Sequence, residues 1–345
     1  MSSLDEPNEG LDSTTSFDGK NEDIELLMKG DNVPTKIFDA SDVQKIEIGG
    51  SPCVVYCSPG FRRSCDDRAY VGYNSMTGEV VFSVADGYLQ KGGVFADVFM
   101  QNVKKERTAI PPEPYKESIE NTVHQTQRAI QEIIAKIKKS TKLTTEDIRK
   151  KIEKLKCSGC CFVHTKLRLN NDGTWDVDAS NAGDSQLLII HRDRKIKRTI
   201  PHNLASIDPT IGDRAFYHHQ RNVLYRSIND EDTCTFDQYR MKVSPGDWVF
   251  MFSDSIANLT PRELEYLTDM CDTPLEAMEV IMTATYEHMS KYTEWMCDPK
   301  TRQHELRYRV RKGCFRDGLK VVPSPDNVAL IIWQVPPATE DTQQV

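Results

Sequence analysis

Aspartates lie at the ends of four short segments, each of which adjoins an apolar run. The segments are Cys65-Asp66-Asp67-Arg68, Val84-Ala85-Asp86-Gly87, Phe252-Ser253-Asp254-Ser255 and Ser324-Pro325-Asp326-Asn327. An ionised carboxylate near a protein core is costly unless it is paired or bound to a cation. Several of them beside strand-like runs therefore predict a shared site for a hard metal ion, which takes oxygen ligands. Any one of these aspartates, taken alone, is also explained as a turn residue.

A second group of possible metal ligands lies in the middle of the chain. Cys157, Cys160 and Cys161 precede His164, which suggests zinc. No second pair of cysteines follows at the spacing of a zinc finger, and Cys161 and Val163 alternate as in a strand, so we favour a strand. The sequence contains no GxGxxG, P-loop, GxSxG or HExxH motif. The aspartates remain the chemically specific pattern.

Composition is that of an ordinary soluble protein. The 345 residues are 38% hydrophobic and 28% charged, enough for one large domain or two medium ones. No apolar run reaches the roughly 20 residues that span a bilayer, and the N-terminus lacks the pattern of a signal segment. The ten cysteines include several in apolar strand-like runs, so we expect reduced thiols. We therefore expect a cytoplasmic protein that does not associate with membranes.

The net charge of −8 is concentrated at the N-terminus. Residues 1–32 hold nine acids and two lysines, a net charge of −7, which leaves about −1 for the rest. A nearly neutral body argues against binding to nucleic acid. We expect an acidic disordered tail over residues 1–35, a folded domain over 36–337 and a short C-terminal tail over 338–345.

Periodicity predicts a mixture of strands and helices. The predicted strands are 52–58, 69–73, 79–85, 160–169, 174–180, 186–191, 248–252 and 328–335. Apolar residues at helical spacing over 119–137, and a capping signal from Thr144 to Asp147, predict a helical hairpin. Further helices are expected from near Thr260 and over 274–292. Residues 201–241 have little periodicity and read as irregular, and together with 291–320 they are candidates for shaping substrate choice.

The order of these segments resembles the metal-dependent serine/threonine protein phosphatases of type 2C. The resemblance covers roughly residues 36–337, and five motifs in the right order carry it. They are Arg62-x3-Asp66-Asp67, Ala85-Asp86-Gly87 followed by Gly92-Gly93, Asn181-Ala182-Gly183-Asp184-Ser185, Gly246-Asp247 leading to Ser253-Asp254, and Asp326-Asn327. The fold it implies is an α+β four-layer αββα sandwich, two central antiparallel sheets flanked by helices.

The resemblance also implies a site with two Mg²⁺ or Mn²⁺ ions and a weaker third. Its metal ligands would be Asp66, Asp67, Asp86, the Gly87 carbonyl, Asp184, Asp254 and Asp326. Asp86 would bridge two ions, about 3.5 to 4 Å apart, that activate a water for attack on phosphorus. Arg62 would clamp the substrate phosphate, since a guanidinium matches two phosphate oxygens.

Three positions depart from the family pattern. Tyr88 replaces a histidine that many members are thought to use as general acid, and a tyrosine with a pKa near 10 is a weak substitute. Ser255 replaces the usual glycine after Asp254, and Asn258 replaces an aspartate for a third ion. Asp184 and Asp254 then remain for that ion.

The resemblance implies hydrolysis of phosphoserine and phosphothreonine in proteins, by an enzyme that we expect to be a monomer. The residues alone support a carboxylate-rich hard-metal site and leave phosphodiesterase or other hydrolase chemistry open. The alternative is a pseudophosphatase that keeps the fold as a binding or scaffold module. The unusual loop after Gly87, together with Ser255 and Asn258, favours this alternative. The retention of every core aspartate argues against it.

Overall fold

Two antiparallel sheets form the centre of the protein. The structure, a computed structural model, describes residues 24–30, 38–60, 62–74, 77–107, 114–207, 223–231, 233–256, 259–297 and 326–336. Within these ranges each sheet has six strands, in the orders β1-β4-β5-β6-β7-β10 and β2-β3-β12-β11-β8-β9. Neighbouring strands all pair antiparallel.

The strand bounds place both sheets on segments from the whole chain. The first sheet contains β1 (Ile24–Lys29), β4 (Arg68–Asn74), β5 (Glu79–Tyr88), β6 (Gly159–Leu169), β7 (Trp175–Ala182) and β10 (Asp237–Val243). The second contains β2 (Gln44–Ile48), β3 (Ser51–Ser58), β12 (Val328–Gln334), β11 (Trp248–Phe252), β8 (Gln186–Ile190) and β9 (Ile196–Arg198).

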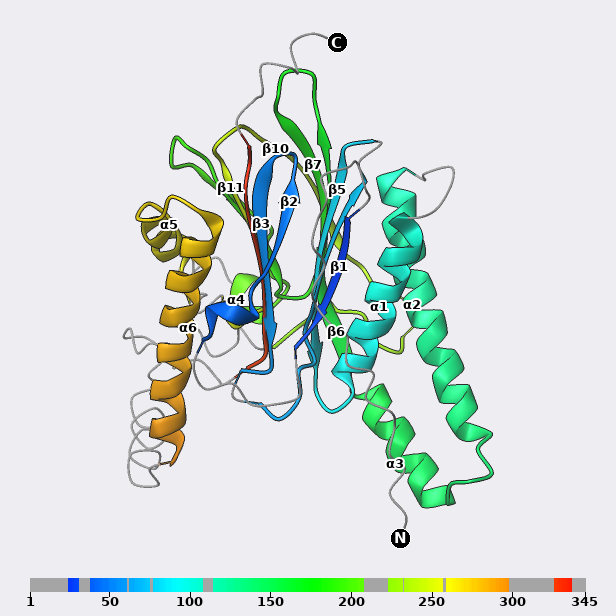
Figure 1. Cartoon of the computed structure of the whole chain (residues 1–345). Helices are drawn as coiled ribbons and strands as arrows, with labels where there is room; N and C mark the ends of the chain where they lie inside the picture. Colours follow the sequence, from blue (N-terminus) through cyan, green and yellow to red (C-terminus); the bar gives the residue numbers. More distant parts are fainter. Residues whose placement is uncertain are drawn as a thin grey trace.

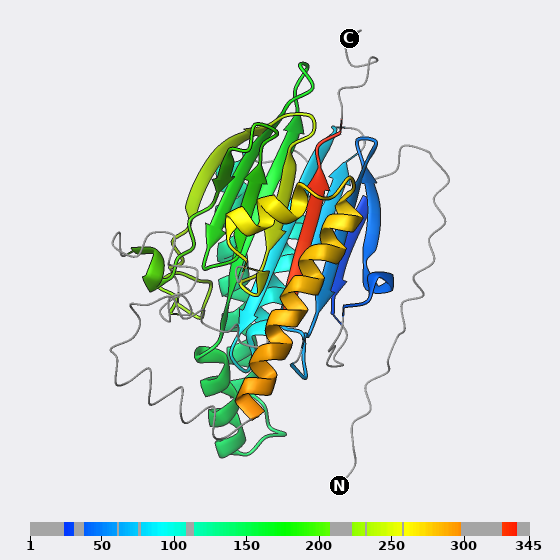
Figure 2. The same cartoon turned by 90° about the vertical axis from the view of Figure 1, so that its left-hand side faces the viewer.

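Helices cover the outer face of each sheet (Figure 1). The first sheet is covered by α1 (Gly92–Arg107) and α2 (Tyr115–Lys138), with α3 (Thr145–Lys156) continuing from α2. The second is covered by α5 (Pro261–Thr268) and α6 (Pro274–Cys297). The short α4 (Leu204–Ile207) and a 3-10 turn (Ala40–Asp42) lie outside the layers. The turned view in Figure 2 shows α6 running along the sheet that holds β12.

Three apolar clusters separate the four layers. The cluster between the sheets includes Phe82, Trp175 and Trp333, whose rings meet edge to face at centroid distances of 5.9 and 5.2 Å. A second cluster joins the first sheet to α1 and α2, and a third joins the other sheet to α5 and α6. Alternate residues of the central strands enter different clusters, as the two-residue strand period requires. The α+β αββα sandwich predicted from the sequence is confirmed.

Several boundaries differ from the sequence predictions. Ile24–Lys29, predicted to be part of the disordered tail, is instead the edge strand β1, paired along its length with β4. Strand β5 does not end at Ala85 but continues to Tyr88, so Asp86 lies inside a strand. Helix α1 was not predicted, although Phe95, Phe99 and Val103 form a buried helical stripe. Residues 1–23, 31–35 and 338–345 lie outside the described residues.

Two further expectations concern the redox state of the cysteines and membrane-spanning helices. The eight cysteines whose side chains are described are free thiols, and Cys160 and Cys161 lie in β6, as the strand prediction required. In the described residues, no helix is both long and apolar enough to cross a membrane.

Candidate metal centre

Five of the predicted acids come from segments that meet near one end of the two sheets. Asp86 lies in β5, Asp67 directly precedes β4 and Asp254 follows β11. Asp326 lies two residues before β12, and Asp184 lies in the turn between β7 and β8. Antiparallel pairing of β5 with β4, and of β12 with β11, brings these ends together.

The charges of these acids act on one another. Burial and then the charge of Asp254 raise the pKa of Asp86 to about 7. Burial and the charges of Asp254 and Asp86 raise the pKa of Asp184 well above its usual value. For Asp326, burial and the Asp254 charge raise the pKa, and Arg62 opposes them. A set of carboxylates whose ionised forms disfavour one another is what a divalent cation would neutralise.

Asp67 gives the clearest sign that a cation or proton belongs here. Its side chain is almost fully buried, at 1% exposure, and neither carboxylate oxygen accepts a hydrogen bond from the described residues. Burial and the charge of Asp86 raise its pKa well above the usual range. Burial of an ionised carboxylate without a partner destabilises the folded state by roughly several kcal/mol, so this group needs a counter-ion or a proton.

The donor set fits hard ions in chemical type, but it is not yet arranged around them. Within the described residues, no group of three or more histidine, cysteine, aspartate or glutamate side chains lies in a ready metal-binding arrangement. The carboxylates therefore share one electrostatic environment without converging on a point. Oxygen donors and no thiolate or imidazole at these positions favour Mg²⁺ or Mn²⁺ over zinc.

Asn327 fastens the loop that carries Asp66 and Asp67. Its side-chain oxygen accepts a hydrogen bond from Asp66 N at 2.7 Å, while its amide donates to the carbonyls of Pro59 and Ser64 at 3.0 and 2.7 Å. The sequence indicated only that Asp326-Asn327 precedes the last strand. The sequence analysis missed these hydrogen bonds of Asn327, because their partners lie more than 260 residues away in the chain.

Close backbone contacts fix the second loop. A Cβ on Gly87 would lie 2.3 Å from the carbonyl carbon of Gly92 and 2.7 Å from Asp66 O. A Cβ on Gly93 would lie 2.5 Å from Oδ1 of Asp66. Gly87 N also donates to Asp66 O at 3.2 Å. Glycine is needed at these positions because two loops with candidate ligands touch there.

Arg62 reaches the cluster by way of Asp326. Its Nη2 donates to Asp326 Oδ2 at 2.7 Å, and its side chain remains 39% exposed. Burial would lower the pKa of Arg62, but the charges of Asp326, Asp254 and Asp86 outweigh it and raise that pKa. The exposed Arg63 has no comparable contact in the described residues. Arg62 is thus a cation at the edge of the acidic cluster.

The three departures from the family pattern have separate outcomes. Tyr88 donates to or accepts from Ser227 Oγ at 2.8 Å, and burial raises its pKa to about 12, which makes it a weaker acid still. Ser255 is buried, with its hydroxyl 3.4 Å from that of Ser253. Asn258 lies outside the described residues.

His202 supports the turn that carries Asp184, a role that no local sequence pattern indicates. The ring Nδ1 of His202 accepts a hydrogen bond from Gly183 N at 3.2 Å, and the backbone N–H of His202 donates to Gly183 O at 2.8 Å. Nε2 lies 3.0 Å from Asp237 Oδ2, so the ring carries its proton on Nε2. Gly183 has a φ of 100° and a Cβ there would lie 2.2 Å from Cys161 Sγ, which fixes the turn from the other side.

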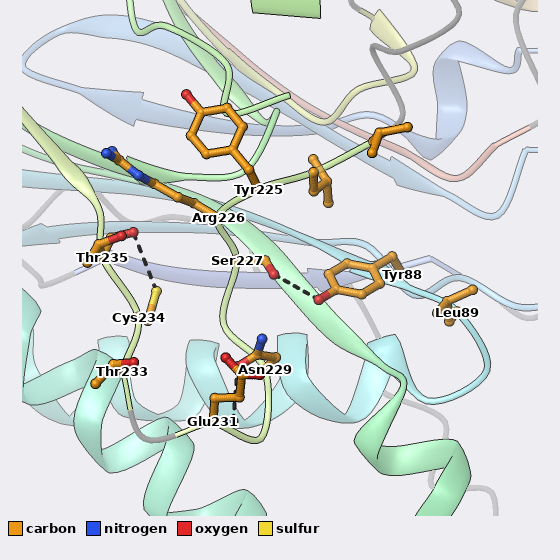
Figure 3. Close-up of a pocket in the computed structure, with 12 residues that line it drawn as sticks. Tyr88, Leu89, Tyr225, Arg226, Ser227, Asn229, Glu231, Thr233, Cys234 and Thr235 are labelled. Atoms are coloured by element: carbon orange, nitrogen blue, oxygen red, sulfur yellow. Dashed lines mark hydrogen bonds between the residues drawn. The ribbon is translucent and has the colours of Figure 1, made fainter. Parts of the chain in front are cut away.

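A pocket opens at Tyr88 and Leu89, the residues that follow Gly87 in the chain (Figure 3). Tyr88 and Leu89, which follow Asp86 and Gly87, form one side, and segment 223–231 with Thr233–Thr235 forms the other. Part of the segment predicted to be irregular, 201–241, therefore lines a cavity together with Tyr88, which lies two residues after Asp86 in the chain. Residues 208–222 and 298–325 lie outside the described residues.

Comparisons with known proteins place this fold. No protein-family model and no curated protein sequence matches the chain. Solved structures do match: a serine/threonine phosphatase from Staphylococcus aureus has a TM-score of 0.60 at 15% identity, with 85% of this chain and 98% of that chain covered. The serine/threonine phosphatase of S. agalactiae has a TM-score of 0.55 at 14% identity, with 82% and 98% covered. This chain has the fold of bacterial serine/threonine phosphatases.

One further match was solved with metal. The catalytic domain of the serine/threonine protein phosphatase PstP, in complex with two manganese ions, has a TM-score of 0.52 at 13% identity, and 82% of this chain and 97% of that chain are covered. Identities this low show a likeness of fold.

Proposed function

We propose that this chain is a metal-dependent protein phosphatase that hydrolyses phosphoserine and phosphothreonine. The observation that carries the proposal is Asp67, a buried carboxylate whose oxygens accept no well-formed hydrogen bond and whose pKa the nearby Ser253 hydroxyl lowers less than burial raises it, in a cluster with Asp86, Asp184, Asp254 and Asp326. In a fold shared with serine/threonine phosphatases, such a cluster is best explained as a site for divalent cations.

The proposed ligands are Asp67, Asp86, Asp254 and Asp326, with Asp66 acting through water and Gly87 through its carbonyl. Asp184 and Asp254 would hold a weaker third ion. Two Mg²⁺ or Mn²⁺ ions bound there would supply an activated water and neutralise charge on the phosphoryl group. The carboxylates would have to rotate to bring their oxygens onto the ions, because in the described residues they do not form a ready metal-binding group.

Arg62 would hold the substrate. Its guanidinium lies at the partly exposed edge of the cluster and pairs with Asp326. When an ion takes up the charge of Asp326, the guanidinium can turn to the phosphate, where two parallel hydrogen bonds are possible. Tyr88 is not a candidate for protonating the leaving group, because its pKa is raised to about 12.

The second candidate function is a pseudophosphatase that binds phosphoproteins or partners without turnover. The absence of a ready metal-binding arrangement in the described residues, with Arg62 drawn onto Asp326, is the observation that favours it. We favour the enzyme because each buried acid costs stability in the absence of an ion, and a binding module has no use for that cost.

Turnover separates the two candidates. Purified protein is assayed with Mn²⁺ on an aryl phosphate and on a phosphoserine peptide, with and without a chelator. The enzyme proposal predicts hydrolysis of both compounds that the chelator abolishes and added Mn²⁺ restores. No hydrolysis at any Mn²⁺ or Mg²⁺ concentration by folded protein would favour the pseudophosphatase.

A further inference from the structure

The pocket beside the metal centre has a volume of about 540 Å³ and two walls from different parts of the chain. Tyr88 and Leu89 belong to the segment that leaves the acids, and Val223 to Glu231 form the facing wall (Figure 3). Since Tyr88 is two residues from Asp86, anything that fills the pocket lies within a few residues' length of the reaction centre.

The walls are held by specific contacts. Tyr88 and Ser227 share a hydrogen bond of 2.8 Å, and Ile228 pairs with Cys160 of β6 through two backbone hydrogen bonds of 2.9 Å. Arg226 forms an ion pair with Asp237 and lies 5.6 Å from the ring centre of Tyr225. Both walls are thus tied to the first sheet, and the pocket is a built feature of the fold.

Exposed apolar side chains gather around this pocket. Leu89 is 62% exposed, Val223 is 47% exposed and Tyr225 is 41% exposed. Of the nine large apolar side chains that are exposed in the described residues, these three line the pocket. Exposed apolar residues that cluster in this way mark an interaction surface.

Leu89 carries a second cost. Its φ is 62°, a left-handed conformation that leucine rarely adopts. An exposed and strained leucine directly after the metal-site strand does not stabilise the free protein. Strain of this kind concentrates at functional sites.

The charges of the pocket select among possible occupants. Its one cation in the described lining, Arg226, is paired with Asp237, and Glu231 lies in the same lining. The pocket therefore has no surplus positive charge for a second phosphate or an acidic residue. The lining mixes polar side chains with the exposed apolar side chains of Leu89, Val223 and Tyr225, and an uncharged apolar group can contact that apolar part.

We propose that this pocket is a subsite for the polypeptide that carries the phosphorylated residue, and that it receives an apolar side chain of the substrate a few positions from that residue. The inference rests on the proposed phosphatase function. An extended polypeptide advances about 3.3 Å per residue, so the phosphate at the acids and a nearby side chain in the pocket can be reached by one chain.

A series of phosphoserine peptides tests the proposal. Each peptide has one leucine at one of the four positions on either side of the phosphoserine, and the other positions are alanine. Leucine at one position, or at two adjacent positions, should raise kcat/KM on the order of tenfold over the all-alanine peptide, as expected for burial of a small apolar group. An aryl phosphate measured beside them reports the chemistry without the subsite.

Leu89→Asn is the decisive variant, because asparagine tolerates the left-handed conformation and removes the apolar side chain. In this variant the ratio of kcat/KM between the preferred leucine peptide and the alanine peptide should fall to about one. Met270→Asn is the matched control: Met270 is 59% exposed after α5, outside the pocket, and the ratio should be unchanged.

The outcomes separate this inference from the proposed function. If wild-type protein hydrolyses the peptides with no dependence on the position of leucine, or if Leu89→Asn keeps the full ratio, the subsite is wrong and the phosphatase stands. If wild-type protein hydrolyses nothing, fluorescence anisotropy with the same peptides decides: tighter binding of a leucine peptide that Leu89→Asn abolishes supports the subsite without turnover, and equal binding of all peptides overturns it.

Discussion

At the scale of single residues, the surroundings of Arg62 and His164 lead to two predictions, one about catalysis and one about stability. Arg62 is partly exposed and pairs with a candidate metal ligand. His164 is almost fully buried, with Nδ1 2.6 Å from Ser83 Oγ and its ring stacked on Tyr115. One bears on the reaction and the other on stability.

Arg62→Ala is expected to weaken capture of phosphorylated substrate. A charge-assisted contact contributes about 1.5 to 3 kcal/mol, so kcat/KM should fall on the order of tenfold or more. Steady-state kinetics on a phosphoserine peptide at saturating Mn²⁺ measure it. Arg63→Ala is the control, because Arg63 is exposed and forms no ion pair with the acids among the described residues. Normal kinetics for Arg62→Ala with a crippled Arg63→Ala would reverse the assignment.

His164 predicts a loss of stability at mildly acid pH. Burial lowers its pKa from 6.5 to about 4, so the unfolded chain binds the proton first as the pH falls. The contribution of His164 to the free energy of unfolding should therefore decrease between about pH 6.5 and pH 4, by up to about 3 kcal/mol, whereas the buried aspartates with raised pKa values act in the opposite direction. Above pH 6.5 both states are neutral and the effect is absent.

Urea unfolding of metal-free protein at a series of pH values measures this effect. His164→Asn keeps a partner for Ser83 and removes the titration, so its stability should fall less steeply than that of wild type across the same window. His124→Asn, at an exposed position of α2, should follow the wild-type curve. Parallel curves for wild type and His164→Asn would show that this histidine does not carry the dependence.

At the scale of elements, the strand ends that carry acids were predictable and the supports of those ends were not. Alternating apolar residues indicated β11 and β12, and turn residues indicated where Asp254 and Asp326 follow or precede them. The clasp by Asn327 and the support by His202 depend on contacts between distant segments. Local patterns carry no signal for such contacts.

The sequence analysis missed strands β2, β9 and β10, the last of which overlaps the segment 201–241 predicted to be irregular. Strand β1 and helix α1 were also missed, and the reasons differ. β1 lies in a run dominated by acids, and composition hid a six-residue strand whose Leu26, Leu27 and Met28 pack onto the core. α1 begins with Gly92-Gly93, which reads as a turn, although the backbone contact with Gly87 is what requires glycine there. Tertiary contact overrode local propensity in both.

The His202 contact makes a prediction about metal affinity. In His202→Asn the amide oxygen can replace Nδ1 as acceptor for Gly183 N–H, whereas in His202→Gln it cannot reach that place. We expect His202→Gln to weaken the Mn²⁺ site that uses Asp184 on the order of tenfold, as loss of a ligand's support does, and His202→Asn to bind nearly as wild type. Electron paramagnetic resonance of free Mn²⁺ measures the affinity. Equal affinities for all three proteins would mean that His202 does not position the turn.

At the scale of the whole molecule, the two sheets act as a rigid frame that gathers residues from position 66 to position 327 into one site. The first sheet depends on its edge. β1 covers β4, and Lys29 and Glu25 pair with Asp97 and Lys104 of α1 at 2.8 and 3.0 Å. The N-terminal region is therefore part acidic segment and part structural strand.

Two truncations separate these parts. Removal of residues 1–23 should leave thermal stability and turnover of an aryl phosphate unchanged, as expected from their acidic composition. Removal of residues 1–30 also deletes β1 and should lower the melting temperature by on the order of 5 °C or more. Differential scanning fluorimetry compares them. Equal melting temperatures would mean that β1 adds nothing to the sheet.

The central claim is that the buried aspartates hold divalent cations, and titration calorimetry with Mn²⁺ tests it most directly. Wild-type protein should bind two ions tightly besides the weaker third, Asp254→Asn should lose one of the two tight ions, and Asp86→Asn should lose both, because Asp86 is the proposed bridge. Both variants should fold, with metal-free melting temperatures at or above that of wild type, since each removes a charge that its neighbours repel. Wild-type stoichiometry and affinity in both variants would contradict the account.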